Sequence, residues 1–377
     1  MIYWMIFGCQ EAQQNHAVTV YIDQDTPENQ TDQTTTESVE DDRSFGDVLR
    51  NLDAGVLSEQ DIAIAENFMA DKVSSPVYCD DIWRVQLSAD RVPIREPEMV
   101  WPHASVPDLL ILPSGAHLIV YNDLRPDLFM DILREDPARF WRQGFLGYGG
   151  IGFSIDRFDG NGFVELLTVD LQFESLQLAV DPDLGYTRDG EIRLSWFGMT
   201  TDVLEDGFIS PMQTEKPHRF YRSQQVDAWT FSEPFLAVSS SAGSTGGVDP
   251  SILSLADGGE ILYVGPLDHY AMGWHSTDLI SWTDAPNVET DVSGATVDTI
   301  LRSDGTHEMF YMKNGFLGEF ETISSLDGFQ WDIGPYKLYS EEGAHNPTAD
   351  YDDEGKLWLY YNQWNDDCIA DLENSMQ

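Results

Sequence analysis

The chain has 377 residues, of which 42% are hydrophobic and 12% aromatic, so it can bury a large core in one domain. Its 66 acidic residues outnumber 20 basic ones, which gives a formal net charge of −46. A surface so negative repels nucleic acid and anionic lipid, and this excludes both as general partners. The same charge suits a saline environment, because salt screens the repulsion between acids.

The first nine residues, MIYWMIFGC, end in Gly-Cys after a short apolar run and resemble the lipobox of a bacterial lipoprotein. The resemblance implies acylation of Cys9. Residues 1–9 are too few for a complete signal peptide and are predicted to be a truncated one. Residues 10–45 are polar and acidic, which predicts a disordered tether. We therefore expect an extracytoplasmic protein, secreted or lipid-anchored to the bacterial envelope, that touches a membrane only through this anchor.

Two helices are expected outside the repeated part of the chain. Within the lead-in at 46–75, Ser58 and Asp61 make a start similar to a capping box, which predicts a helix over about 58–72. A second helical segment at 125–145 interrupts the first repeat and carries four arginines. This insertion is either a packed helix whose arginines pair with acids or a lid that borders a pocket.

A β-hairpin pattern occurs five times between residues 76 and 377. Each copy joins an apolar run, a polar turn containing glycine, and an alternating strand that ends in aromatic residues or valine. The turn glycines are Gly115, Gly190, Gly258, Gly305 and Gly355. A unit of roughly 50 residues is typical of stacked or radially arranged architectures.

A second pattern follows the first four hairpins. Ser and Trp stand six residues apart in the segments 223–229, 276–282 and 325–331, while 154–160 keeps Ser and Asp without Trp. A Ser or Asp that bonds its own turn, followed by an aromatic side chain on the sheet, predicts the connection between third and fourth strands. Each hairpin plus one such turn makes a four-stranded unit.

These units predict an all-β fold, a monomeric five-bladed β-propeller over 76–377, with a β-sandwich as the alternative. The fifth unit lacks its own second turn, so residues 76–87 are expected to supply the missing strand. A disulfide between Cys79 and Cys368 would close the ring in an oxidising compartment, and two unrelated buried thiols are the alternative.

Two positions on each innermost strand are expected to meet at a central funnel. Residues two apart share one face of a strand, so both positions face the centre. The ninth position before each turn glycine holds Val106, Asp181, Asp249, Thr296 and Asn346. The seventh position holds Asp108, Asp183, Ser251, Asp298 and Thr348. A turn one residue shorter before Gly305 would instead align Asp298 with Asp249.

Three of these motifs together resemble a known family. They are Asp-Pro-Ser-Ile at 249–252, Leu-x-Asp-Gly at 255–258 and Ser-x-Asp-Gly-x-x-Trp at 325–331. The pattern is similar to five-bladed propeller glycosidases of the arabinanase, xylosidase, levansucrase and invertase type. The resemblance implies a carboxylate base or nucleophile from the first blade, an orienting Asp and a Glu acid in the central pocket.

The catalytic residues that the resemblance implies are Asp108, Asp181 and Glu174. Val106 stands where the family places its first Asp, so Asp108 is the candidate base; Asp181 would orient it and Glu174 would be the acid. The candidates for binding substrate are His103, Asp183, Asp249, Asp298 and Asn346. His103 could equally be structural, and Asp249 could equally cap its own strand.

Two classes of function follow from these candidates. One is a glycoside hydrolase-like protein that acts on a neutral glycan, and the other is a noncatalytic propeller lipoprotein that binds a glycan or a protein. No cofactor is predicted. The acidic segment 156–165 is a weak match to a Ca²⁺ loop, since it fails the EF-hand spacing, and the sequence has no zinc, phosphate-loop or Gly-x-Ser-x-Gly motif.

Overall fold

The structure is a computed structural model in which the described residues are almost entirely β-strand. It describes residues 58, 79–124, 150–156, 163–169, 176–187, 189–200, 219–227, 230–231, 235–239, 247–266, 270–289, 297–313 and 318–365. The predicted signal, the tether, nearly all of the lead-in and the insertion at 125–145 lie outside these ranges. Within them, no helix has the length and apolar character needed to cross a membrane.

Four antiparallel sheets follow one another along the chain, and each begins with its innermost strand. The first contains β3 (Ala104–Ile111), β4 (His117–Asp123), β5 (Gly150–Asp156) and β6 (Phe163–Val169). The second contains β7 (Leu176–Tyr186), β8 (Ile192–Thr200), β9 (Arg219–Asp227), β10 (Thr230–Phe231) and β11 (Phe235–Ser239). The third contains β12 (Gly247–Ser254), β13 (Glu260–Pro266), β14 (Tyr270–Ser276) and β15 (Thr283–Glu289). The fourth contains β16 (Val297–Leu301), β17 (His307–Lys313), β18 (Glu319–Ser325) and β19 (Trp331–Ser340).

The fifth sheet joins the two ends of the repeated region. Its strand order is β2-β1-β21-β20, formed by β1 (Asp80–Leu87), β2 (Glu98–Trp101), β20 (Ala344–Tyr351) and β21 (Leu357–Trp364). β1 pairs antiparallel with β21 along its whole length. The expected latch segment therefore does complete this sheet. It is longer than predicted, because β1 continues into a hairpin with β2 and supplies two strands instead of one.

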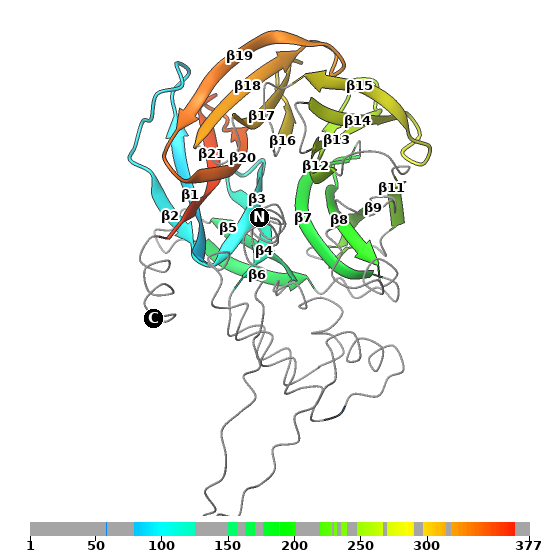
Figure 1. The fold of residues 1–377 in the computed structure, drawn as a ribbon, viewed down its shortest axis with the longest axis horizontal. Coiled ribbons are helices and arrows are strands. Elements are labelled where there is room, and N and C mark those ends of the chain that lie inside the picture. The colour runs from blue at the N-terminus through cyan, green and yellow to red at the C-terminus, as the bar shows by residue number, and fades with distance from the viewer. Residues whose placement is uncertain are drawn as a thin grey trace, which may run out of the picture.

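The innermost strands of the five sheets form a closed ring. β3 contacts β7, β7 contacts β12, β12 contacts β16, β16 contacts β20, and β20 contacts β3. Figure 1 shows the sheets radiating from this centre like blades. The described part of the chain is thus a β-propeller, and the sandwich alternative is wrong. Radial closure leaves only short sheet edges, which protects the fold from pairing with other chains.

The five hairpin turns form as predicted, and so do the outer turns at 276–282 and 325–331, whereas 154–160 and 223–229 are only partly described. The five turn glycines have φ between 74° and 87°, a region that side chains other than glycine rarely adopt. In the outer turn of the fourth sheet, Asp327 accepts the backbone N–H groups of Phe329 and Gln330, each at 2.8 Å. Trp331 then donates its indole N–H to the hydroxyl of Tyr263 in the neighbouring sheet at 3.1 Å. The Ser-to-Trp pattern therefore both closes a turn and joins two blades.

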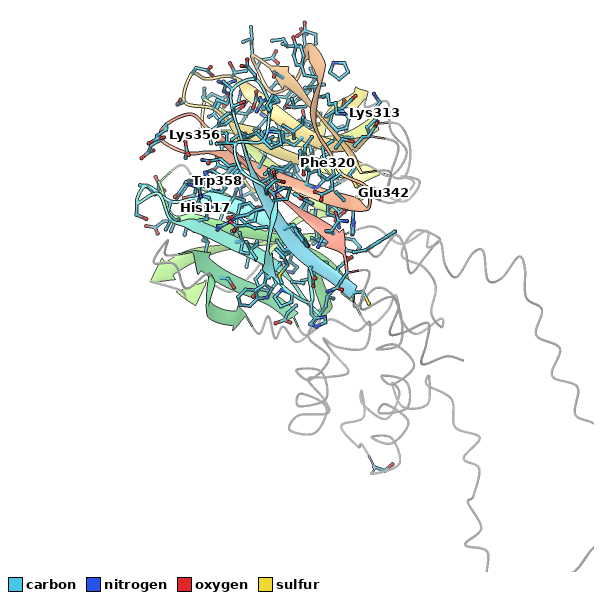
Figure 2. The ribbon with its side chains drawn as sticks, turned by 90° about the vertical axis from the view of Figure 1, so that its left-hand side faces the viewer. His117, Lys313, Phe320, Glu342, Lys356 and Trp358 are labelled. Carbon is cyan, nitrogen blue, oxygen red and sulfur yellow. The ribbon has the colours of Figure 1, made fainter. Side chains whose placement is uncertain are left out.

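The hydrophobic core is divided into layers between adjacent blades. One cluster joins the third and fourth sheets, one the fourth and fifth, and one the fifth and first. At the junction of the last and first sheets, the His117 ring lies edge-on to Trp358 at 4.7 Å (Figure 2) and its Nδ1 lies 2.6 Å from the Tyr360 hydroxyl. This packing holds the ends of the ring together.

Candidate funnel site

The innermost strands enter the centre through an unusual backbone conformation. Four residues at the ninth position have φ between 47° and 53°, and each precedes a proline. These residues are Val106, Asp181, Asp249 and Asn346. The register of each of these strands shifts at this residue, as in a β-bulge, beside the proline that cannot donate to the sheet. The bulge separates the ninth and seventh positions into two distinct layers.

The seventh-position side chains form a closed ring of hydrogen bonds between blades. Each accepts the backbone N–H of the sixth position in the next blade. Asp108 accepts from Leu184, Asp183 from Ile252 at 3.0 Å, Ser251 from Thr299 at 2.9 Å, Asp298 from Ala349 at 2.9 Å, and Thr348 from Leu109 at 3.1 Å. We call these five side chains the interblade ring. Asp298 belongs to this layer, so the alternative alignment with Asp249 is wrong.

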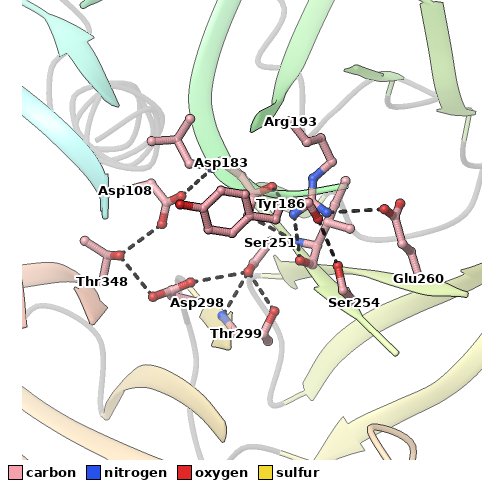
Figure 3. Close-up of polar contacts among 12 residues, drawn as sticks. Asp108, Asp183, Tyr186, Arg193, Ser251, Ser254, Glu260, Asp298, Thr299 and Thr348 are labelled. Carbon is pink, nitrogen blue, oxygen red and sulfur yellow. Dashed lines mark hydrogen bonds and ion pairs between the residues drawn. The ribbon is translucent and has the colours of Figure 1, made fainter. Parts of the chain in front are cut away.

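The carboxyl groups of the interblade ring are linked to one another as well as to backbone. The Thr348 hydroxyl lies 3.0 Å from both Asp108 Oδ1 and Asp298 Oδ2 (Figure 3). Burial, then the charges of Asp298 and Asp183, raise the pKa of Asp108 well above its usual range. Burial also raises the pKa of Asp183 to about 7, although Arg193 beside it acts in the opposite direction. Both oxygens of Asp108 are thus engaged in holding blades together.

The ninth-position layer contains buried oxygen atoms without partners. Asp181 Oδ2, Asp249 Oδ2 and Asn346 Oδ1 make no hydrogen bond within the described part of the chain, although their side chains are at most 6% exposed. Buried polar atoms are ordinarily paired, so three orphans in one layer point to a ligand that would satisfy them. The prolines of this layer line a small hollow together with Val106, Asp249 and Asn346, and Asp108, Ser251 and Asp298 of the interblade ring line it as well.

The two aspartates of this layer have different environments. Asp181 accepts a hydrogen bond from the Asn122 amide at 3.2 Å and one from the backbone N–H of Asp249. These bonds oppose the rise that burial causes in the pKa of Asp181. Burial, followed by the charge of Asp181, raises the pKa of Asp249 well above its usual range. The pKa of Asp249 is thus raised further than that of Asp181, and Asp181 is the one of the pair that ionises first.

Two asparagines that the sequence analysis missed position this layer. Asn122 Oδ1 accepts the N–H of Asp181 at 3.1 Å, and Asn362 Oδ1 accepts the N–H of Val106 at 2.7 Å. Both asparagines stand seven residues after a turn glycine, and Met312 at the same position accepts the N–H of Asn346 through sulfur at 3.3 Å. Counting forward from each glycine, as well as backward, would have found them.

The remaining predicted residues lie elsewhere. His103 donates its backbone N–H to Asp81 at 3.0 Å and accepts that of Leu124, which places it at the junction of the first and fifth sheets and not in the lining of the hollow. Glu174, Cys9 and Cys368 lie outside the described residues. The Ca²⁺ candidate segment is only partly described, and no described group of three or more His, Cys, Asp or Glu residues is placed to hold a metal ion.

Cys79 is disulfide-bonded, and its partner lies outside the described residues. The carbonyl of Cys79 accepts the backbone N–H of Asn365 at 2.7 Å. The chain three residues before Cys368 therefore lies beside Cys79.

No family model and no curated protein matches the sequence. Solved structures with a similar fold include a protein of unknown function from Dyadobacter fermentans, at 13% identity over 74% of this chain and 82% of that one, with a TM-score of 0.43. A xylan β-1,4-xylosidase from Bacillus halodurans matches at 13% identity over 70% of this chain and 53% of that one, with a TM-score of 0.46. An exo-β-1,3-galactanase from Clostridium thermocellum matches at 12% identity over 69% and 54%, with a TM-score of 0.45. This chain spans about half the length of the two glycosidases. Likenesses of this degree assign it no activity.

Proposed function

We propose that this chain is a glycoside hydrolase-like protein that acts on a neutral glycan through Asp181 and Asp249 at the centre of a five-bladed propeller. The observation that carries this proposal is the pair of buried carboxyl groups from neighbouring blades, each with an unpartnered oxygen. Glycoside cleavage needs two carboxyl groups in different protonation states. A neutral glycan is favoured because a chain of net charge −46 repels anionic polymers.

The two aspartates take different roles in this proposal. Asp249, kept protonated by burial and by the charge of Asp181, donates its proton to the oxygen of the leaving group. Asp181, held by Asn122, is ionised and either attacks the anomeric carbon or removes a proton from the attacking water. Asn346 offers a free carbonyl oxygen to a sugar hydroxyl. Asp108, the candidate base of the sequence analysis, serves the interblade ring instead.

The test is reducing-sugar release by the full-length protein, in high salt, from a panel of neutral polysaccharides and oligosaccharides. Asp181→Asn and Asp249→Asn are each expected to lower kcat by about 100-fold or more while the fold persists. Asp332→Asn is the matched control for Asp181→Asn, because it removes one negative charge from the exposed side of β19. A different result would assign the catalytic role to Asp108. In that result, the Asp108→Asn variant folds but releases no reducing sugar, while the Asp249→Asn variant keeps its activity.

A second candidate function is noncatalytic binding of a glycan or a protein in the same funnel. Val106 favours it, because this valine puts an apolar side chain on the first blade at the position where three other blades put Asp or Asn. Calorimetry separates the two functions. A glycan that binds with saturation and is recovered uncleaved would establish the noncatalytic protein.

We further propose that the protein is extracytoplasmic and anchored through a lipid on Cys9. The polar segment that follows this cysteine supports the proposal, since a tether of that kind holds a folded domain away from a membrane. The test is expression in a bacterial host with an upstream extension that completes the signal peptide ahead of residues 6–9, followed by fractionation and mass spectrometry. Cys9→Ser should move the extended protein from the membrane fraction to the soluble fraction, and an unacylated Cys9 in the extended protein would contradict the proposal.

A further inference from the structure

A second and larger cavity lies at the opposite end of the innermost strands. Its volume is about 560 Å³, within the range of small-molecule pockets. It is lined by residues from 109–111, 184–187, 252–260, 298–301 and 350–351, together with Arg193. The hollow at the strand starts shares only Asp298 with it. The interblade ring therefore separates the funnel site from this cavity, which we call the distal cavity.

The walls of the distal cavity are more polar than apolar, with an aliphatic part, and one tyrosine is fixed in them. Leu184, Leu255 and Ile300 contribute apolar surface. The hydroxyl of Tyr351 accepts a hydrogen bond from Arg91 and donates one to Glu308, each at 2.7 Å. These bonds fix the position of Tyr351. The cavity is thus preformed on this side and does not need to be organised by a ligand.

The electrostatic character of the distal cavity is negative. Arg193 is the single basic residue among the described residues that line it, and it is neutralised by Asp183 at 3.4 Å and Glu260 at 3.3 Å. Asp350 lies in the wall, partly exposed, and accepts the backbone N–H groups of Ile111 and Tyr351 at 2.9 and 2.7 Å. It forms no ion pair with any described residue. Its negative charge is therefore uncompensated.

Tyr186, at the end of β7, lines the same cavity as Asp350. Figure 3 shows the ring of Tyr186 in front of Asp183, a member of the interblade ring. Burial, followed by the charge of Asp350, raises the pKa of the Tyr186 hydroxyl, so this charge acts on the tyrosine within the cavity. The electron-rich face of a tyrosine attracts cations, and more strongly where water is excluded.

We propose that the distal cavity binds a small organic cation, with its ammonium group between Asp350 and the Tyr186 ring and its apolar body against the aliphatic wall. An anion would be repelled by Asp350 and Asp298. An inorganic cation such as Ca²⁺ needs six or more oxygen ligands, and no described cluster of acids is placed to supply them. A neutral sugar would leave the charge of Asp350 uncompensated. An alkylammonium or quaternary ammonium ligand fits both the charge and the walls.

Calorimetric titration of the full-length protein with choline tests this proposal. The control ligand is its neutral isostere, in which a tert-butyl group replaces the trimethylammonium group, and ionic strength is held constant. We expect choline to bind one-to-one and the isostere to bind at least about tenfold more weakly. Equal binding of the two would show an apolar cavity without cation recognition. Displacement of choline by CaCl₂ at equal ionic strength would show a metal site.

Three variants locate the binding. Asp350→Asn and Tyr186→Leu are each expected to weaken choline binding about tenfold. Asp332→Asn removes the same charge as Asp350→Asn, but from an exposed position on β19, and it should leave choline binding unchanged. If Asp332→Asn weakens choline binding as much as Asp350→Asn does, then choline is attracted only by the overall negative charge of the protein and not by the distal cavity. Thermal unfolding checks the fold, and if Asp350→Asn does not fold, the result with Tyr186→Leu decides.

Discussion

The interblade ring predicts a large loss of stability from one isosteric substitution, Thr348→Val. The side chain of Thr348 is 1% exposed, and valine fills the same space without the hydroxyl. That hydroxyl accepts the N–H of Leu109 at 3.1 Å and lies 3.0 Å from one carboxyl oxygen each of Asp108 and Asp298. The substitution therefore removes an acceptor and a donor that join the last blade to the first and fourth.

The magnitude follows from the groups left without partners. The N–H of Leu109 would be buried and unsatisfied, which costs about 1–3 kcal/mol. The single hydroxyl proton bonds one carboxyl group at a time, and losing a hydrogen bond to a charged group costs about 1.5–3 kcal/mol. We expect Thr348→Val to lower the free energy of unfolding by about 2.5–6 kcal/mol, the sum of these two costs and a large part of the roughly 5–15 kcal/mol typical of a folded domain.

Thr322→Val is the matched control for this measurement. Thr322 is 2% exposed on β18, and its hydroxyl has no hydrogen-bond partner in the described part of the chain. Its replacement should change the free energy of unfolding by less than about 1 kcal/mol, or stabilise the protein. Urea unfolding in high salt, followed by tryptophan fluorescence, compares the two variants. Equal losses would refute the conclusion that the ring bonds hold the blades together.

Three further outcomes are expected. The pKa of Asp183 is about 7, and the pKa values of Asp298 and Asp350 are about 6. All three lie above 3.8, the value that an aspartate has in the unfolded chain. The folded state therefore binds more protons than the unfolded state between about pH 4 and pH 7. The free energy of unfolding should therefore fall as pH rises through this window, and urea titrations that give equal or higher stability at about pH 8 than at about pH 5 would contradict these pKa shifts. Because the net charge is −46, added NaCl should raise the melting temperature, and a constant melting temperature would show that repulsion between acids does not limit stability. We propose Cys368 as the partner of Cys79; peptide mapping should find this pair, and Cys368→Ser should cost about 2–5 kcal/mol, whereas a pair between Cys79 and Cys9 would be contrary evidence.

The propeller could be predicted from the sequence because its unit is repeated with local signals. A turn glycine such as Gly258 and an outer turn such as 325–331 depend only on neighbouring residues, so their spacing reports the strands directly. The second latch strand, β2, was not predicted; it joins the last blade only because β1, its neighbour in the chain, pairs with β21 from the far end of the chain. The spacing of turn motifs along the sequence does not show which distant segments pair with one another.

The candidate site was predicted as a set of positions but not as two layers. Strand alternation put Asp108 and Val106 on one face, whereas the bulge before Asp108 shifts the register and sends its carboxyl group to the next blade. The roles that we propose for Asp181 and Asp249 depend on burial and on Asn122, which is distant in the chain. The distal cavity was not predicted, because a cavity is a property of packing among five strands.

The most direct test of the proposed pair compares two substrates in the Asp249→Asn variant. A nitrophenyl glycoside has a leaving group that departs without protonation, while an unactivated glycoside requires an acid. We predict that Asp249→Asn loses about 100-fold or more in kcat/KM on the unactivated glycoside and little on the nitrophenyl glycoside, while Asp181→Asn loses activity on both. Equal losses on both substrates in Asp249→Asn, or no cleavage of either by the unchanged protein, would contradict the assignment of Asp249 as the acid.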